Sequence, residues 1–442
     1  MNVLMLTVAL ATHATPIRLE DARARSRENV QALTAVLEAS SAEQDVRVAR
    51  SSLLPQIRFS GSGNLTYIGP QRSYNIVPVE GGGFQQLAVD TPEVAFPNLS
   101  LGVSISQLLY DRAVWARLEQ SGAQLEAQRG EALEQQDTSE LEGITRFYSL
   151  FRSQATIQVL DANVRRSEQQ LDRARALFQA GRVGKAEELS AQVNLGNDRI
   201  AVVSRQSQLA TDQARLTTWL AMPGAEVVEA VDPGVLTQTP APAPTLEHAL
   251  KEARTRRPLL VALRQRLRAA ELQRSIATAG YLPRFSLDAA YQRQGQDPEI
   301  FFGQPSRQNV VRGGVSISWD VFNGFTTQAQ TRRAEYQTRA AELNMQQSER
   351  EMEGTVRQSH VALEAQIVSA ELAEANRKAA ADALVLAEER FNAGVSSTLE
   401  VRDAQLKLTQ AELTLLENRI NVEIARFTLM RAMGTLAPGE AK

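Results

Sequence analysis

The sequence predicts a mainly α-helical fold with a smaller β part, built as two copies of one plan. Three observations predict it. Short motifs recur in the same order, each copy holds two alternating strand patterns, and each ends in helical runs far longer than a globular core requires. Only 5% of the 442 residues are aromatic, and the net charge is -3 with acids and bases interspersed. Nucleic acid is therefore not an expected partner.

The chain is a tandem duplication. The recurring segments are "LEDA" at 19–22 and "LEHA" at 246–249, "LLPQIRFS" at 53–60 and "YLPRFSLD" at 281–288, and "VSIS" at 103–106 and 315–318. The alternating prolines of "VDPGVLTQTPAPAPT" cannot continue a helix. We therefore expect a first repeat over 15–230, an extended linker over 231–245 and a second repeat over 246–442.

Residues 1–14 are expected to be a signal peptide, because an apolar run from Val3 to Ala11 precedes the small residues Thr12 and Ala14. This segment lacks Lys and Arg, so the alternative is the frayed start of a helix. The chain has no cysteine, which excludes disulfides, thiolate zinc sites and lipid attachment to an N-terminal cysteine. No later segment has the roughly 18–20 consecutive apolar residues of a membrane-spanning helix.

Each copy is expected to begin with a helix. In the first copy the helix runs from about Leu19 to Ser51 and ends before Pro55, and in the second copy it ends before Pro283. Apolar residues then alternate with small polar residues over four segments, at about 56–68, 98–109, 284–294 and 309–322. A period of two over about ten residues indicates strands with one apolar and one polar face. A polar, Gly-rich loop is expected between the first two strands.

Two interpretations of these strands remain open. They form a soluble antiparallel sheet on a core, or they cross a membrane with their apolar side chains toward lipid. Four strands cannot close a barrel, and an open sheet edge cannot lie in hydrocarbon. A membrane location therefore requires several chains to share one barrel. The lipid-facing residues would be Ile57, Phe59, Leu101, Val103, Ile105, Phe285, Leu287, Val315, Ile317 and Trp319.

A long helical hairpin follows each strand pair. No proline occurs from about Arg112 to Gln179 or from about Thr326 to Asn392. Each run is up to roughly 67 residues, or about 100 Å at the rise of an α-helix. A second helix of about 35 residues returns after each glycine turn, near Gly181 and Gly394.

The returning helix of the second copy carries two heptad stripes. One consists of Val401, Leu408, Leu415, Val422 and Leu429, and the other of Leu399, Leu406, Leu413, Ile420 and Phe427. Two stripes about 140° apart indicate neighbours on both sides, as in a closed wall of helices around a tunnel. The alternative is a helix inside an ordinary bundle. The first copy keeps one stripe, Leu195, Val202, Leu209 and Leu216.

No pattern of catalytic or ligand-binding residues emerges. His13, His248 and His360 are too widely separated to give metal-ligand spacing. The "AGRVGKAEE" segment has a Gly-Lys pair, but Gln179 and Ala186 replace the first glycine and the Ser or Thr of a phosphate-binding loop. We therefore predict that the chain is not an enzyme and binds no cofactor and no catalytic metal.

The duplicated order of helix, strand pair, long helix, glycine turn and returning helix resembles the TolC family of outer-membrane efflux proteins. The residues that carry the resemblance are "FNAGVSSTLEVRDAQLKLTQAE", "FQAGRVGKAEELSAQVNL", "LLPQ", "YLPR" and both "VSIS" strands. The resemblance covers about Leu19 to Gly434. It implies a homotrimer with one twelve-stranded β-barrel in the outer membrane of a Gram-negative bacterium. A twelve-helix α-barrel tunnel would continue into the periplasm and meet a periplasmic adaptor joined to an inner-membrane transporter.

The resemblance also assigns roles near the glycine turns. Glu400, Asp403 and Glu187 would form a periplasmic gate, an acidic ring of the kind that favours cations. The alternative is a solvated acidic helix face. The adaptor-docking tip would consist of Gly181, Val183, Gly394, Val395 and Ser396.

The leading hypothesis is a trimeric outer-membrane channel that acts as the passive exit duct of a tripartite efflux pump or a type I secretion system. The second hypothesis is a soluble periplasmic coiled-coil scaffold whose strands form an ordinary sheet. A general diffusion porin is disfavoured, because so much of the chain is helical and only four strands are predicted.

Overall fold

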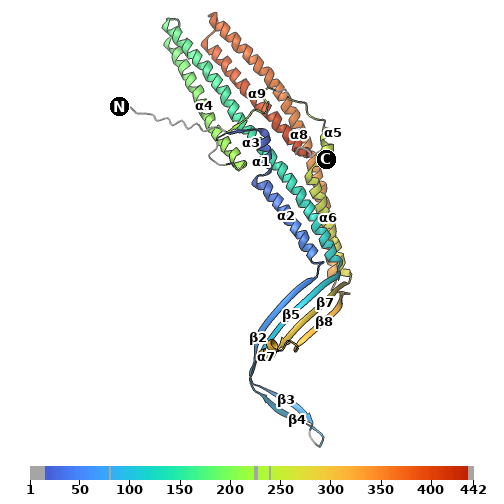
Figure 1. The fold of residues 1–442 in the computed structure, drawn as a ribbon. Helices are drawn as coiled ribbons and strands as arrows, with labels where there is room; N and C mark the ends of the chain where they lie inside the picture. The colour runs from blue at the N-terminus through green and yellow to red at the C-terminus, as the bar shows by residue number, and fades with distance from the viewer. Residues whose placement is uncertain (1–14, 79–80, 223–226, 238–239, 437–442) are drawn as a thin grey trace, which may run out of the picture. The chain divides into compact units, whose positions relative to one another are not determined.

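The structure is a computed structural model that describes residues 15–78, 81–222, 227–237 and 240–436, so the expected signal peptide lies outside the described residues (Figure 1). The chain divides into two units. The helical unit consists of Met1–Ser41, Glu126–Gln265 and Leu343–Lys442, and the strand unit of Ala42–Leu125 and Arg266–Glu342. Each unit is described by itself.

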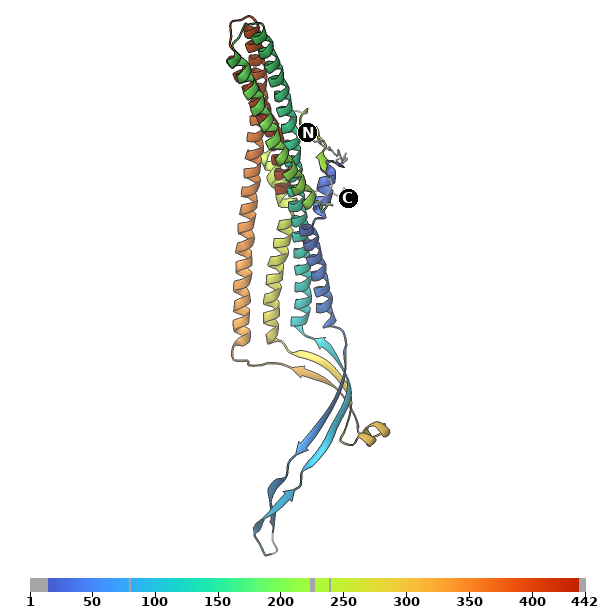
Figure 2. The ribbon, with the colours of Figure 1, turned by 90° about the vertical axis from the view of Figure 1, so that its left-hand side faces the viewer.

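Two long helical hairpins dominate the fold, as predicted. The first joins α3 (Arg112–Gln179) to α4 (Lys185–Trp219), and the second joins α8 (Thr326–Asn392) to α9 (Thr398–Met433). Helices α3 and α8 contain 68 and 67 residues. Within the helical unit the hairpins lie side by side in both views (Figures 1 and 2), and side chains of α9 hydrogen-bond to α3 and α4.

The heptad stripes of α9 differ in their burial. Val401, Leu408, Leu415, Val422 and Leu429 are all buried, as expected for a packing seam. In the second stripe Ile420 is buried, whereas Leu399 is 75% exposed and Leu406 is 47% exposed in a single chain. The second stripe therefore leaves an apolar surface near the start of α9.

The largest buried cluster of the helical unit surrounds the middle of α3. Its members include Ile144, Phe147, Tyr148, Leu150, Leu216 and Ile420. Each such side chain contributes about 1.5–3 kcal/mol when fully buried. The cluster also includes Ile17 and Val228, which belong to β1 (Thr15–Ile17) and β6 (Val228–Ala230). These two short strands pair in parallel, a small sheet that the sequence did not predict.

The prediction of one helix over the start of the first copy is wrong. The structure has α1 (Leu19–Arg27) and α2 (Val30–Ser51). The Oδ1 of Asn29 accepts a hydrogen bond from the amide of Ala32 at 2.9 Å, so Asn29 begins a new helix. The second copy breaks at the equivalent place, between α5 (Leu246–Arg256) and α6 (Pro258–Thr278), where a proline lacks the amide needed to continue the first helix.

The strand unit holds an antiparallel sheet in the order β2-β5-β7-β8. The strands are β2 (Gln56–Ile68), β5 (Val94–Tyr110), β7 (Arg284–Gly295) and β8 (Asn309–Ser318). Strands β2 and β8 are the two edges, and the sheet is open within the described residues. The strand pairs of both repeats therefore join into a single sheet.

Three details of the strand unit correct or extend the sequence analysis. The expected Gly-rich loop contains a second two-stranded sheet, β3 (Gln71–Pro78) with β4 (Phe84–Thr91). A short helix, α7 (Pro298–Gly303), lies between β7 and β8. Strand β8 ends at Ser318, so the prediction of Trp319 as a strand residue is wrong. The indole Nε1 of Trp319 instead donates to the carbonyl oxygen of Tyr281 at 3.1 Å.

Within the described ranges, no helix is both long enough and apolar enough to cross a membrane.

Candidate functional site

Both hairpins turn at a glycine with the same backbone geometry. Gly181 has a φ of +71° and Gly394 a φ of +76°. Each glycine amide bonds to the carbonyl three residues back, and the next amide bonds to the carbonyl five residues back. This is the Schellman arrangement, which ends a helix and favours glycine because its φ is positive. The quoted sequence motif thus specifies one turn twice.

The acids predicted for the gate are already engaged in a single chain. Glu400 accepts a hydrogen bond from the Ser396 hydroxyl at 2.6 Å and lies 3.3 Å from the guanidinium of Arg390. Asp403 lies 2.7 Å from the ammonium of Lys407, and both side chains are more than half exposed. Glu400 and Asp403 are therefore solvent-accessible carboxylates near the start of α9, with basic partners within reach.

Glu187 is separate from these two acids. Its Oε2 accepts a hydrogen bond from the Thr398 hydroxyl at 2.6 Å, which links the start of α4 to the start of α9. Among the described residues, Glu187 shares no hydrogen-bond partner with Glu400 or Asp403. The structure thus brings the two turns together, but a single chain does not gather the three predicted acids into one cluster.

A cavity of about 260 Å³ lies between the hairpins close to the turns. Side chains from all four long helices line it, including Leu177, Val183, Glu187, Phe391 and Arg402. Of the residues predicted for the docking tip, Val183 faces this cavity, and Val395 is 68% exposed at the other turn. The turn region therefore combines exposed apolar side chains with a mixed polar and apolar hollow.

A buried ion pair near the turns was not predicted from the sequence. Arg402 of α9 forms a two-pronged ion pair with Asp198 of α4, with nitrogen–oxygen distances of 2.8 and 2.9 Å. Ser167 of α3 donates to Asp198 at 2.5 Å and accepts from Arg402 at 3.1 Å. The fully buried Gln405 also reaches Ser167 at 3.1 Å. Three helices are thus joined through one buried network.

A second buried aspartate repeats part of this arrangement. Asp212 of α4 accepts a hydrogen bond from Ser153 of α3 at 2.6 Å. Asp198 and Asp212 are both buried, and each lies three residues after an apolar member of the α4 heptad stripe. An acid at a seam position of a heptad is the sequence signal that could have identified this contact.

The sheet has a mainly apolar face and a mainly polar face, although Arg293 pairs with Leu101 on the apolar face. The register pairs Ile57 with Ile105, Phe59 with Val103, Leu287 with Val315 and Phe285 with Ile317. On the opposite face the hydroxyls of Ser62 and Ser100 lie 2.9 Å apart, and those of Ser286 and Ser316 lie 2.6 Å apart. The strand residues predicted to face lipid therefore share one face, apart from Trp319, which lies beyond the strand.

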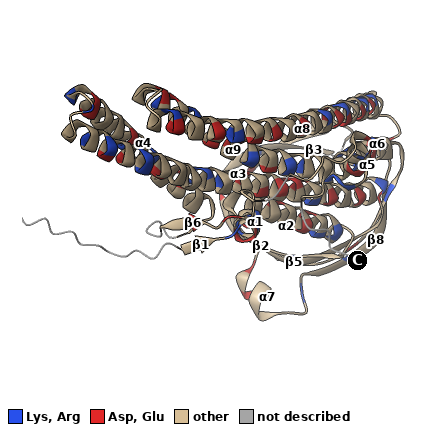
Figure 3. Ribbon diagram, turned by 90° about the horizontal axis from the view of Figure 1, so that it is seen from above, with Lys and Arg blue, Asp and Glu red and all other residues tan. Residues whose placement is uncertain are grey.

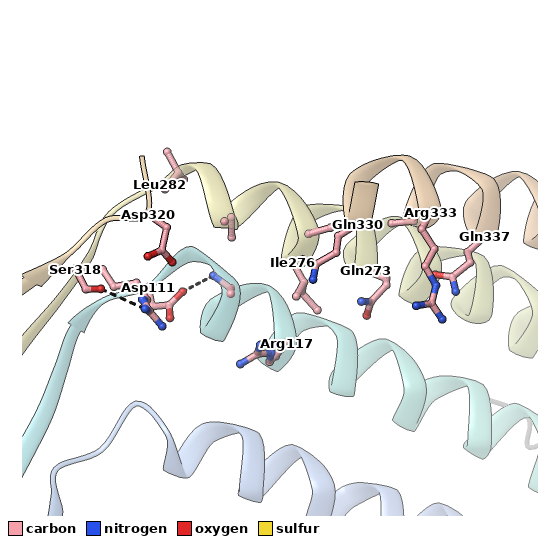
Figure 4. Close-up of a pocket in the computed structure, with 16 residues that line it drawn as sticks. Asp111, Arg117, Gln273, Ile276, Leu282, Ser318, Asp320, Gln330, Arg333 and Gln337 are labelled. Carbon is pink, nitrogen blue, oxygen red and sulfur yellow. Dashed lines mark hydrogen bonds between the residues drawn. The ribbon is translucent and has the colours of Figure 1, made fainter. Parts of the chain in front are cut away.

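A larger cavity, of about 750 Å³, lies in the strand unit where the sheet meets the helices. Figure 4 shows Arg117 of α3, Gln273 of α6 and Arg333 of α8 lining it from three helices. Asp111 and Asp320 line its end near the sheet (Figure 4), so acids offset the arginines.

Acids and bases also alternate along the long helices (Figure 3). Across the described part of the chain, no three His, Cys, Asp or Glu residues are grouped to hold a metal.

Comparisons with known proteins agree with this architecture. The family model described as "Outer membrane efflux protein" matches residues 19–221 and 249–435. The outer membrane protein TolC of Vibrio cholerae is 22% identical over 98% of this chain and 95% of its own length. The TolC protein of Escherichia coli is 24% identical over 90% of this chain and 79% of its own length.

Solved channels have the same fold. A structure of CusC has a TM-score of 0.77 at 18% identity and covers 94% of this chain and 92% of its own. The open MtrE channel of Neisseria gonorrhoeae has a TM-score of 0.70 at 18% identity, with 95% and 89% covered. Because the family model spans both repeats, with their strands and hairpins, the chain belongs to the outer membrane efflux protein family.

Proposed function

We propose that three copies of this chain assemble into a passive exit duct, which a periplasmic adaptor connects to an inner-membrane transporter. Membership of the family gives the chain its role in efflux at the outer membrane. The observation that carries the proposal of a shared duct is the open four-stranded sheet with one apolar and one polar face. Substrates would pass through the duct chemically unaltered.

The edges of the sheet support assembly. Strands β2 and β8 each have an unpaired side within the described residues, and such edges cannot remain unpaired in hydrocarbon. Pairing β8 of one copy with β2 of the next satisfies both edges. Three copies of a four-stranded sheet give twelve strands, which is within the range of outer-membrane barrels. The apolar face would meet lipid and the hydroxyl-rich face would line the lumen.

The exposed part of the second α9 stripe supports a shared helical wall. Leu399 and Leu406 lie on the surface of a single chain, although apolar residues at heptad spacing normally pack against another helix. A neighbouring copy would cover them. In the assembled duct the two glycine turns would form the adaptor-docking end, and Glu400, Asp403 and Glu187 would form the acidic gate.

Two neighbouring substitutions test the orientation of the sheet. Phe59 lies on the apolar face and Ser60 on the hydroxyl-rich face of β2, opposite Gly102. Phe59→Arg would place a charge in lipid at a cost of about 2–4 kcal/mol near the bilayer midplane, whereas Ser60→Arg would point into water. We expect the first variant to lose membrane insertion and the crosslinked trimer, while the second keeps both.

The measurement is fractionation of native membranes with chemical crosslinking, and the wild-type chain is the reference. If the wild-type chain is soluble or monomeric, the shared duct is wrong. If both arginine variants insert equally well, the assignment of the apolar face to lipid is wrong. A soluble periplasmic scaffold would give equal effects of both variants on membrane association, and the family does not favour that function.

A further inference from the structure

Two arginines on the hydroxyl-rich face of the sheet have no role in the function proposed above. Arg58 lies on β2 and Arg312 on β8, which are the two edge strands. The register pairs Arg58 with Ser104, Ser104 with Ala290 and Ala290 with Arg312. Partners in a cross-strand row point to the same face of a sheet. Both guanidinium groups are therefore on the face opposite Phe59 and Val103.

The charges on this face are mostly positive. Its charged residues within β2, β5, β7 and β8 are Arg58, Arg284, Asp288 and Arg312. Arg284 lies at the beginning of β7 and lines the same cavity as Asp111 and Asp320, so its charge is offset there. The row that contains Arg58 and Arg312 has one nearby acid, Asp288.

Neither of the two arginines is paired with an acid, although Arg312 lines the same hollow as Asp288. The side chains of Arg58 and Arg312 form no hydrogen bond or ion pair with any residue that the structure describes, and both residues are exposed. Asp288 instead accepts hydrogen bonds from the hydroxyls of Ser286 and Ser316, each at 2.9 Å. By contrast, the guanidinium group of Arg72 on β3 donates two hydrogen bonds to the carboxylate of Asp90. The guanidinium groups of Arg58 and Arg312 are thus available to a solute.

In the proposed barrel these side chains would be concentrated in a narrow zone. Three strand spacings of about 4.8 Å separate β2 from β8, and a tilt of about 35–45° offsets the two arginines by about 10 Å along the barrel axis. The three spacings put the two arginines about 14 Å apart, within two Debye lengths of about 10 Å at 0.1 M salt, so their potentials overlap in part. Three copies would place six guanidinium groups and three carboxylates in this zone.

We infer that Arg58 and Arg312 form an anion-attracting zone in the lumen of the strand unit, which favours the passage of anionic organic solutes. This inference rests on the trimeric duct proposed above. It concerns a different set of residues from the acids near the glycine turns, which would favour cations. Guanidinium groups bind carboxylate, sulfate and phosphate groups through paired hydrogen bonds. Solutes that carry such groups are therefore the class this zone would favour.

A polyanion provides a direct probe. Wild-type trimers in a planar bilayer are exposed to myo-inositol hexakisphosphate in 0.1 M KCl, and the half-blocking concentration is measured from single-channel currents. We expect the Arg58→Gln/Arg312→Gln variant to raise that concentration by about tenfold or more, because charge attraction in the lumen is lost. Raising KCl to 1 M should abolish the difference through screening.

Three further variants test whether block depends on the position of the two arginines or only on the net charge of the protein. Arg72→Gln removes one positive charge where the double variant removes two, but Arg72 is already paired with Asp90, so block should not change at all. Arg58→Lys keeps the charge and should keep most of the block. Asp288→Asn removes the nearby acid and should lower the half-blocking concentration.

The outcomes distinguish this inference from the proposed function. If the wild-type chain forms no conducting trimer, the duct is wrong and this inference fails with it. If trimers conduct but block is the same in wild type and in the Arg58→Gln/Arg312→Gln variant, only the anion-attracting zone is overturned. Block that is weakened equally by Arg72→Gln would also overturn it, because the effect would then follow net charge alone.

Discussion

The Arg402–Asp198 ion pair is a buried contact that joins the two hairpins near their turns. The exposed fractions of the two side chains are 12% and 9%, so removal of one partner leaves the other charge buried. We expect Asp198→Ala to lower the free energy of unfolding by about 3–5 kcal/mol. Urea unfolding of the detergent-solubilised protein, followed by circular dichroism, measures the change.

Asp403→Ala is the matched control for this prediction. It also removes an aspartate from an ion pair, but the side chains of Asp403 and Lys407 are 59% and 69% exposed. Exposed pairs contribute below about 1 kcal/mol. Equal losses of stability for the two variants would show that the buried network around Asp198 does not hold the hairpins together.

Asp137 provides a prediction about pH. This buried residue of α3 lies 3.0 Å from Arg27 of α1. Burial raises the pKa of the Asp137 carboxyl above its ordinary value of 3.8, although Arg27 acts in the opposite direction. The folded chain therefore holds this proton over a pH range in which the unfolded chain has lost it. The contribution of Asp137 to stability falls as pH rises through that range.

The Asp137→Asn variant has no titrating group at this position. We expect the difference in free energy of unfolding, variant minus wild type, to increase as pH rises from about 4 to 7. Denaturant unfolding at several pH values measures it. Parallel stability curves for the two proteins would contradict the assignment.

Individual site residues were harder to predict than their surroundings. The heptad stripe of α4 was evident in the sequence, because apolar side chains at seven-residue spacing pack on one helix face. Asp198 lies on that face, but a carboxylate at a seam is stable only if a distant residue neutralises it. That partner, Arg402, lies in the other repeat. Pairing between repeats depends on three-dimensional packing, which local sequence patterns do not contain.

At the scale of elements, the turn at Gly394 makes a specific prediction. A Cβ added there would meet no atom within 4 Å, so the positive φ alone opposes a side chain. We expect Gly394→Ala to destabilise the α8–α9 hairpin by about 1–2 kcal/mol. Gly354 lies inside α8, and a Cβ added there would also meet no atom within 4 Å, but Gly354 has no positive φ. Gly354→Ala should therefore stabilise by about 0.5–1 kcal/mol.

Thermal unfolding of the two alanine variants beside wild type provides the measurement. Shifts of opposite sign are expected, because the two glycines differ in backbone conformation and not in available space. A destabilisation of the same size in both variants would mean that an unrecognised contact, rather than the positive φ, determines the effect at Gly394.

The longest elements were predicted well, and several shorter ones were not. Strand β2 shows a period of two over more than ten residues, and helix α3 was predicted because no proline interrupts its sequence. Every described residue of β3 and β4 is exposed, so no alternation of apolar and polar residues was required and the segment resembled a loop. The break between α1 and α2 depends on one side chain, Asn29, which is a short signal within a helical pattern.

At the scale of the whole molecule, the proposed duct depends on surfaces that a single chain leaves uncovered. The edges of β2 and β8 and the exposed side chains of Leu399 and Leu406 are all explained by neighbouring copies. The proposed gate depends on the same assembly. In one chain Glu400, Asp403 and Glu187 have separate partners, and in the proposed duct the acidic ring would form from equivalent residues of three copies.

The gate predicts a change in conductance when its acids are removed. Glu400 and Asp403 are three residues apart on α9, so their carboxylates share one helix face. Three copies would present six carboxylates, which attract divalent cations into the proposed constriction. We expect Glu400→Ala/Asp403→Ala to weaken block by a divalent cation such as Mg²⁺ by about tenfold or to raise single-channel conductance.

The control is Glu364→Ala/Glu371→Ala, which removes two exposed acids from α8. Glu371 lies 23 residues before Gly394, or about 35 Å along the helix, so this control changes the net charge equally while leaving the turn intact. Divalent-cation block and conductance that are the same in both double variants and in wild type would remove Glu400 and Asp403 from the gate.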